Sequence, residues 1–123
     1  MNNKAYQKWA VSLDRTYGEL LVRLAQDPEK LRLINMAMGL SGETGELADA
    51  LKKYLVYGKD LNLENVKEEC GDILWYMANL LDSIGSSFEE VMELNRLKLS
   101  QRFPEGKFTE ELAQKRLDKQ PKD

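Results

Sequence analysis

The residues of this sequence best suited to chemistry are two pairs of carboxylates, each with a spacing of three. Glu43 and Glu46 form the first pair, and Glu69 and Asp72 form the second. Residues three apart lie on the same side of a helix, so each pair can present two carboxylates together. Carboxylates held close to one another repel unless protons or cations intervene. The pattern therefore indicates a binding site for a cation.

The kind of cation follows from the residues that the chain lacks. There is no histidine, which excludes His-ligated zinc, a Ser-His-Asp triad and the Glu-x-x-His di-iron pattern. Oxygen ligands alone suit Mg²⁺, or Mn²⁺ in its place, and Mg²⁺ is commonly completed by substrate phosphates. The spacing leaves a second interpretation open, because 21 Asp and Glu residues produce several such pairs on solvated helix surfaces by chance.

The acidic pairs are expected on helices, because strand signals are nearly absent and clear boundaries delimit helical segments. Asp27 and Pro28 are typical of a helix start, Gly58 of a helix end, and Ser87-x-x-Glu90 of a capping box. These signals predict an all-α fold with helices at residues 5–25, 28–57, 63–84 and 88–102, and a short helix from residue 109. Gly18 is a weak point in the first of these helices. The second helix contains glycines that predict a bend or an interruption: Gly39, Gly42 and Gly45.

Apolar stripes on the two middle helices predict how these helices pack. At ~100° per residue, the stripe of helix 28–57 is about 80° wide. It contains Leu33, Ala37, Leu40, Thr44, Leu47, Leu51 and Leu55. The stripe of helix 63–84 contains Val66, Cys70, Ile73, Met77, Leu81 and Ile84. Each acidic pair lies on the same flank of its stripe, so antiparallel packing through the stripes brings the two pairs together. Cys70 is then a small core residue rather than a nucleophile.

Length and composition predict one soluble globular domain. The chain has 123 residues, of which 42% are hydrophobic and 32% are charged. Its formal net charge of −3 offers no general attraction to nucleic acid or to anionic membranes. No run approaches the ~20 apolar residues that a membrane span needs. A single cysteine permits no intrachain disulfide, which fits a cytoplasmic compartment. We therefore expect neither a nucleic-acid nor a membrane partner.

Two segments resemble the MazG-type nucleoside triphosphate pyrophosphohydrolases, an all-α superfamily that also holds the dimeric dUTPases, the dCTPases and the phosphoribosyl-ATP pyrophosphohydrolases. The signature of the family is Glu-x-x-Glu followed, after a variable gap, by Glu-x-x-Asp. The corresponding segments here are Glu43-Thr44-Gly45-Glu46 and Glu69-Cys70-Gly71-Asp72. The resemblance covers residues 35–108 and continues through Asn95-Arg96-Leu97-Lys98-Leu99 and Arg102-Phe103-Pro104.

The resemblance implies a fold, a reaction and an assembly. The fold is a four-helix-bundle-like, MazG-type all-α domain. From the chain itself, we assign residues 1–108 to this domain and expect residues 109–123 to form a short tail that is helical and then frayed. The reaction is Mg²⁺-dependent hydrolysis of a nucleoside or deoxynucleoside triphosphate to the monophosphate and pyrophosphate. The four acids carry over as catalytic residues and metal ligands. The subunits assemble as a homodimer or a dimer of dimers. The preferred base and sugar stay open.

Two residues of the middle helices are candidates for binding the nucleotide. Lys53 lies two helical turns after Glu46 and can reach a substrate phosphate. Lys52 is close to it in angle, and the resemblance favours Lys53, although either lysine can also serve only to close the helix. Tyr76 follows Asp72 by one turn and can stack on the nucleoside, or it can pack in the core or in a dimer interface.

Asn95, Lys98 and Arg102 repeat at helical spacing and together suggest a polar edge that holds phosphate or sugar. Each of them is also compatible with an ordinary surface position. Trp75 lies opposite the predicted core stripe of its helix, which suggests a subunit interface.

Two other functions stay open beside a general nucleoside triphosphate pyrophosphohydrolase. The first is a specialised enzyme of the same fold that acts on dUTP, dCTP, a modified nucleotide or an alarmone. The second is a non-catalytic helical interaction protein. The presence of all four acids argues against the second, because a decayed site is expected to lose at least one ligand.

Overall fold

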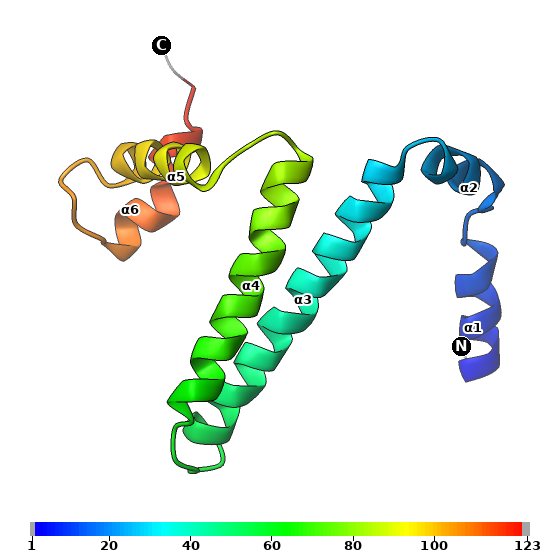
Figure 1. Cartoon of the computed structure of the whole chain (residues 1–123), viewed down its shortest axis with the longest axis horizontal. Coiled ribbons are helices and arrows are strands. Elements are labelled where there is room, and N and C mark those ends of the chain that lie inside the picture. The colour runs from blue at the N-terminus through cyan, green and yellow to red at the C-terminus, as the bar shows by residue number, and fades with distance from the viewer. Residues whose placement is uncertain (1, 122–123) are drawn as a thin grey trace.

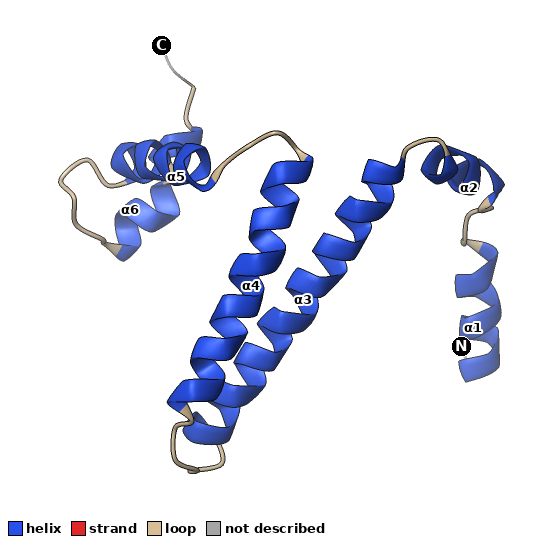
Figure 2. Ribbon diagram, in the orientation of Figure 1, coloured by secondary structure: helices blue, strands red, loops and turns tan. Residues whose placement is uncertain are grey.

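The computed structural model describes residues 2–121, and every regular element in this range is helical (Figures 1 and 2). The elements are α1 (Asn3–Ser12), α2 (Gly18–Ala25), α3 (Pro28–Leu55), α4 (Leu63–Ser83), α5 (Phe88–Arg102), α6 (Glu110–Lys115) and a 3₁₀ turn, η1 (Leu117–Lys119). The predicted all-α class is confirmed. None of the helices in the described range is both long enough and apolar enough to span a bilayer.

The centre of the molecule is an antiparallel hairpin of α3 and α4, joined by a short turn (Figure 1). Helix α2 contacts α3, and α6 and η1 pack on α5 at the other side of the hairpin. Helix α1 extends away from the hairpin (Figure 1). The hairpin is therefore the element that positions the acidic pairs.

Local sequence explains why α3 is long and where it begins and ends. Asp27 caps its first turn by accepting a hydrogen bond from the Glu29 N–H at 3.1 Å, and Pro28 has the fixed φ that suits a first helical position. The predicted interruption is wrong, because α3 runs unbroken through its three glycines. After Leu55 the chain turns at Gly58, whose φ of +64° is readily adopted only by glycine.

The predicted single helix at residues 5–25 is wrong, because the chain breaks between α1 and α2. Asp14 lies in this break, where its carboxylate accepts hydrogen bonds from the Arg15 N–H and the Tyr17 hydroxyl, both at 2.8 Å. Such local side-chain bonds compete with helical hydrogen bonds. Gly18 then begins α2 as a separate helix.

The seam between α3 and α4 is rotated from the predicted stripes. The buried residues of the hairpin are Met36, Leu81 and Glu69. Several predicted core residues are exposed instead: Ala37, Thr44, Leu51, Leu55, Cys70 and Ile84. The prediction that Cys70 is a core residue is therefore wrong for the single chain. The acidic pairs lie closer to the seam than the predicted stripes placed them.

The seam includes Gly39, where the ring of Tyr76 lies directly against the backbone of α3. A Cβ atom built at Gly39 would overlap the Tyr76 ring. Glycine at this position therefore allows α4 to approach α3 closely, and Tyr76 contributes to the seam.

We predict that Gly39→Ala destabilises the protein although alanine is the better helix former. The gain in helix propensity is about 1 kcal/mol, whereas overpacking against a ring typically costs about 1–3 kcal/mol. A Cβ atom built at Gly42 meets no atom within 4 Å. The matched substitution Gly42→Ala should therefore raise the free energy of unfolding instead. Urea unfolding of both variants measures the difference. Equal stability changes in the two variants would contradict the packing described here.

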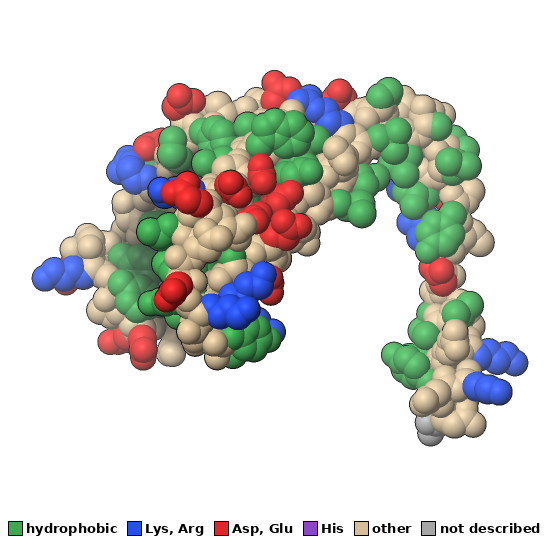
Figure 3. Space-filling view, turned by 60° about the horizontal axis from the view of Figure 1, so that its bottom comes forward, with side chains coloured by type: hydrophobic (Ala, Val, Ile, Leu, Met, Phe, Trp, Pro, Cys, Tyr) green, Lys and Arg blue, Asp and Glu red, His purple; other side chains and the backbone are tan. Residues whose placement is uncertain are grey.

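A large part of the apolar surface is left uncovered in the single chain (Figure 3). The accessible surface is 10224 Å², whereas a compact monomer of this mass exposes about 6,800 Å². Exposed apolar side chains on the hairpin include Leu31, Met38, Leu55, Leu74 and Trp75. The hairpin therefore keeps an apolar surface on the side that does not form the seam.

Candidate metal and nucleotide site

Three of the four predicted acids come together on the hairpin. One carboxylate oxygen from each of Glu43, Glu69 and Asp72 lies within 4.8 Å of the other two. Glu43 belongs to α3, and the other two belong to α4. The side chains differ in exposure, since Glu69 is only 8% exposed and Asp72 is open to solvent. The arrangement presents several hard oxygen ligands at one point of the seam.

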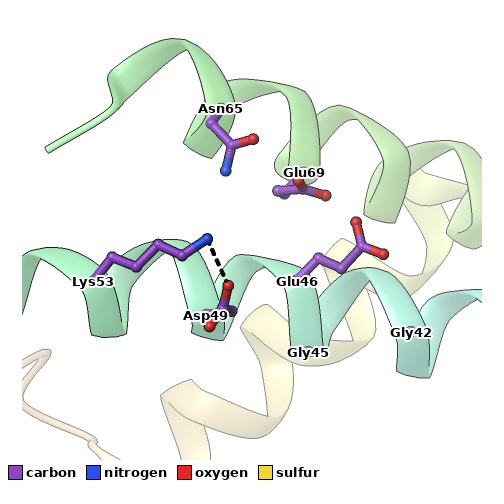
Figure 4. A pocket seen from close by; sticks show the side chains of 7 residues that line it. All are labelled: Gly42, Gly45, Glu46, Asp49, Lys53, Asn65 and Glu69. Carbon is purple, nitrogen blue, oxygen red and sulfur yellow. Dashed lines mark ion pairs between the residues drawn. The ribbon is translucent and has the colours of Figure 1, made fainter.

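Glu46 lies beside this group rather than within it. Its carboxylate points from α3 toward Glu69 on α4, across the gap between the helices (Figure 4). The negative charge of Glu46 acts on Glu69, as its effect on the pKa of that residue shows. All four predicted acids therefore gather at the same part of the hairpin, with Glu46 set slightly apart.

The electrostatics of Glu69 reflect its burial among other carboxylates. Burial raises the pKa of Glu69 above its usual value, and the charges of Glu46, Glu43 and Asp72 raise it further. No cation offsets this repulsion within the described residues, because none of the ion pairs of the chain involves these four acids. A bound metal cation would relieve both the burial cost and the repulsion.

We predict that the metal-free protein loses stability as the pH rises above the ordinary pKa of a glutamate, 4.5. In this range the folded state holds the Glu69 proton more tightly than the unfolded state, so the free energy of unfolding falls with increasing pH. Glu69→Gln should flatten this fall, and Mg²⁺ should reduce the difference between the variant and the wild type. Thermal unfolding in a chelator, at several pH values, measures the effect.

The control for this experiment is Glu68→Gln, because Glu68 is an exposed neighbour on the same helix. This variant should keep the pH dependence of the wild type. An unchanged pH dependence in Glu69→Gln would show that Glu69 is already ionised without strain in the folded protein.

A cavity of about 440 Å³ opens beside the acids (Figure 4). Residues from both helices of the hairpin line it: Gly42, Gly45, Glu46, Asp49, Lys53, Asn65 and Glu69. The two glycines lack side chains, which leaves space next to the carboxylates. The cavity is polar, and its lining combines acids with a cation and an amide.

Lys53 lines this cavity, and its predicted role in binding a phosphate stays a prediction. Its Nζ atom forms an ion pair with Asp49 at 2.9 Å, four residues earlier on α3 (Figure 4). The hydrogen bond that the Lys53 ammonium donates to the Asp49 carboxylate raises the pKa of Lys53. Lys53 thus presents a fixed positive charge next to the acids.

Comparisons with known proteins identify the family of this chain. Residues 32–107 match the MazG nucleotide pyrophosphohydrolase domain, and this range contains all four acids and Lys53. The chain belongs to the MazG nucleotide pyrophosphohydrolase family. Its match to Gene 37 protein of Mycobacterium phage L5 is 36% identical over 76 residues, which cover 58% of this chain and 66% of that protein. No solved structure gives a significant match.

Tyr76 lies within the MazG domain, and its surroundings explain its position in the seam. Its ring packs on Gly39 and makes an edge-on contact with Trp75, with the ring centroids 4.9 Å apart. Of the two roles that the sequence left open, these contacts correspond to packing. Trp75 itself remains 56% exposed, so its predicted role in a subunit interface stays a prediction.

The three predicted substrate residues on α5 lie outside this cavity in the MazG chain. Asn95 and Lys98 are exposed on α5. Arg102 is occupied by the tail, because its guanidinium donates two hydrogen bonds to Asp118 at 2.7 and 2.9 Å. Asp118 has only 1% of its side chain exposed, and the Arg102 guanidinium holds its pKa far below the usual range.

The tail of the MazG chain is partly ordered by this ion pair. Helix α6 is capped by Thr109, as the predicted short helix requires, and η1 carries Asp118 onto the end of α5. The predicted fraying at residues 119–123 falls partly on residues 122–123, which lie outside the described residues.

Sequence reasoning missed two residues that line the cavity, Asp49 and Asn65. Both are at helical spacing from predicted residues. Asp49 lies three residues after Glu46, and Asn65 lies four residues before Glu69. The periodicity that placed the acids could therefore have placed these residues as well.

Proposed function

We propose that this protein hydrolyses a nucleoside or deoxynucleoside triphosphate to the monophosphate and pyrophosphate, with Mg²⁺ as the required cation and Mn²⁺ as a substitute. Membership of the MazG family supports nucleotide pyrophosphohydrolase activity in general. The observation that carries the finer proposal is the convergence of Glu43, Glu69 and Asp72, with oxygens within 4.8 Å of one another beside a polar cavity.

The residues fit a hard divalent cation. The donor set consists of carboxylate oxygens, which Mg²⁺ and Mn²⁺ prefer, and its buried member has a raised pKa that a cation would lower. Glu43, Glu69 and Asp72 would hold the metal. The metal would neutralise charge on the triphosphate and make a water molecule more acidic.

The residues of the chain have separate tasks in this proposal. Lys53 binds a phosphate oxygen through its ammonium, for which it exchanges its ion pair with Asp49. Glu46 points into the cavity and stands apart from the three-oxygen group, so it can orient the attacking water and accept its proton. Gly42 and Gly45 leave space for the phosphates next to the carboxylates.

We also propose that the active protein is a homodimer or a dimer of dimers. The chain exposes roughly half as much surface again as a compact monomer of its mass. The exposed apolar residues of α3 and α4 lie on the hairpin that carries the site. A second copy covering this surface would bury it. Asn95 and Lys98 are exposed on α5 and free to act across a subunit boundary in such an assembly, whereas Arg102 is held by Asp118.

A substrate panel tests the proposed reaction and decides among the substrates that the sequence left open. The purified protein is incubated with the standard nucleoside and deoxynucleoside triphosphates, with modified nucleotides and with an alarmone. We expect turnover only with Mg²⁺ or Mn²⁺, and the ratio kcat/KM ranks the substrates. The proposal fails if the protein binds the metal and leaves every nucleotide intact, and a non-catalytic interaction role would then be favoured.

A further inference from the structure

A second cavity of about 290 Å³ adjoins the first at the turn end of the hairpin. The two cavities share Lys53 and Asn65, which therefore lie at their junction. The rest of the second cavity is lined by Ala50, Lys59, Asp60 and Asn62. The space beside the acids thus continues past Lys53 and Asn65 toward the turn between α3 and α4.

The backbone of the turn places Lys59 at this cavity. Gly58 has a positive φ of +64°, which reverses the chain direction after α3. The Lys59 N–H then donates a hydrogen bond back to the Lys53 carbonyl at 3.1 Å. The two lysines are consequently fixed at the same end of the hairpin.

The charges divide the combined cavity into two parts. Glu46 and Glu69 lie at one end, whereas Lys53 and Lys59 lie toward the other. Lys59 takes part in none of the ion pairs found among residues 2–121, although Asp60 lines the same cavity. At the junction, Asn65 directs its side-chain amide into the gap between the helices (Figure 4). An amide and two ammonium groups are all donors for phosphate oxygens.

We propose that the second cavity holds the two terminal phosphates of the substrate, with Lys59 and Asn65 as binding residues that work beside Lys53. The inference rests on the proposed function and predicts how the substrate is oriented along the hairpin. The pyrophosphate part points toward the α3–α4 turn, and the nucleoside part points along the hairpin in the opposite direction. Lys59 and Asn65 then recognise the diphosphate group and not the base.

Binding of the two products separately tests this direction. Isothermal titration calorimetry with Mg²⁺ measures the affinity of wild type, Lys59→Ala and Asn65→Ala for inorganic pyrophosphate and for a nucleoside monophosphate. We expect each variant to bind pyrophosphate about tenfold more weakly, because one donor to the diphosphate is lost. Monophosphate affinity should stay unchanged. Lys67→Ala is the control, since Lys67 is an exposed lysine of α4 that pairs with Glu64.

Two results would overturn the inference: a loss of monophosphate affinity in the Lys59 and Asn65 variants, or pyrophosphate affinities equal to that of the wild type. Because Lys59 lies in an exposed turn, its replacement should leave thermal unfolding unchanged and keep the test valid. Product binding requires no turnover. If pyrophosphate binding depends on Lys59 while no nucleotide is hydrolysed, the proposed function fails and this inference stands.

Discussion

Replacing Glu69 by alanine should lower kcat/KM for nucleotide hydrolysis by at least about a hundredfold, since losing even the partners of metal ligands commonly costs 10–100-fold. Glu69 is the buried carboxylate at the meeting point of the acids, and its negative charge is balanced by no cation of the described chain. In the proposed site, this variant removes a ligand of the cation from α4. Steady-state kinetics at saturating Mg²⁺ measures the effect.

The matched control for this variant is Glu68→Ala. It removes the same charge from the neighbouring position of the same helix, where the side chain is exposed and outside the acidic group. Glu68→Ala should retain wild-type kinetics within about a factor of two, as most surface substitutions do. Similar losses in both variants would mean that overall charge matters and that the position of Glu69 does not.

The second large effect is expected at the exposed apolar surface of the hairpin. Leu74→Glu should convert the assembled protein into smaller species, because it places a charge on a surface that a second copy would bury. Leu74 is 57% exposed in the single chain and adjoins Trp75. Analytical ultracentrifugation measures the size of both proteins, and hydrolysis should fall together with assembly if subunits complete each other's sites.

Gln114→Glu provides the control for this substitution, since it introduces a negative charge on the exposed surface of α6. It should leave the size of the assembly unchanged. A wild-type protein that sediments as a compact monomer at all concentrations would contradict the proposed assembly. A compact monomer would require α1, α2 and α5 to fold back onto the hairpin and cover its exposed apolar surface.

The helices were largely predictable because their ends carry local signals. Asp27, Pro28 and Gly58 marked the limits of α3. At the start of α5, the Ser87 hydroxyl accepts a hydrogen bond from the Glu90 N–H at 3.2 Å, which is one half of the predicted capping box, whereas the Glu90 carboxylate accepts from the Ser86 hydroxyl. The break between α1 and α2 escaped prediction, since it depends on hydrogen bonds of Asp14 that compete weakly with a helix. The sequence indicated a weak point only at Gly18, where α2 begins after the break.

The packing of the helices could not be predicted as well as their limits. Both stripes were chosen for apolar residues, but the seam also contains Gly39, whose missing side chain makes room for the Tyr76 ring. A glycine contributes nothing to an apolar stripe, so the stripes could not predict its effect on how the helices pack. The apolar residues left over, such as Leu55 and Cys70, remain exposed in the single chain.

The acidic site was the part of the function best specified by sequence. The spacing of the carboxylates and the absence of histidine indicated a hard cation, and the three-dimensional convergence of Glu43, Glu69 and Asp72 agrees with that hypothesis. The role proposed for Lys59 needed the structure, because the turn at Gly58 and the antiparallel pairing bring it to one cavity with Asn65. The ion pair between Arg102 and Asp118 likewise depends on tertiary structure.

The most direct test of the central claim is a ³¹P NMR spectrum of the products formed from one accepted nucleoside triphosphate. With Mg²⁺ present, we expect resonances of the monophosphate and inorganic pyrophosphate to grow together in equal amounts, and we expect neither with a chelator or with Glu69→Ala. Formation of the diphosphate and orthophosphate would contradict the account, as would hydrolysis that proceeds unchanged in the Glu69→Ala variant.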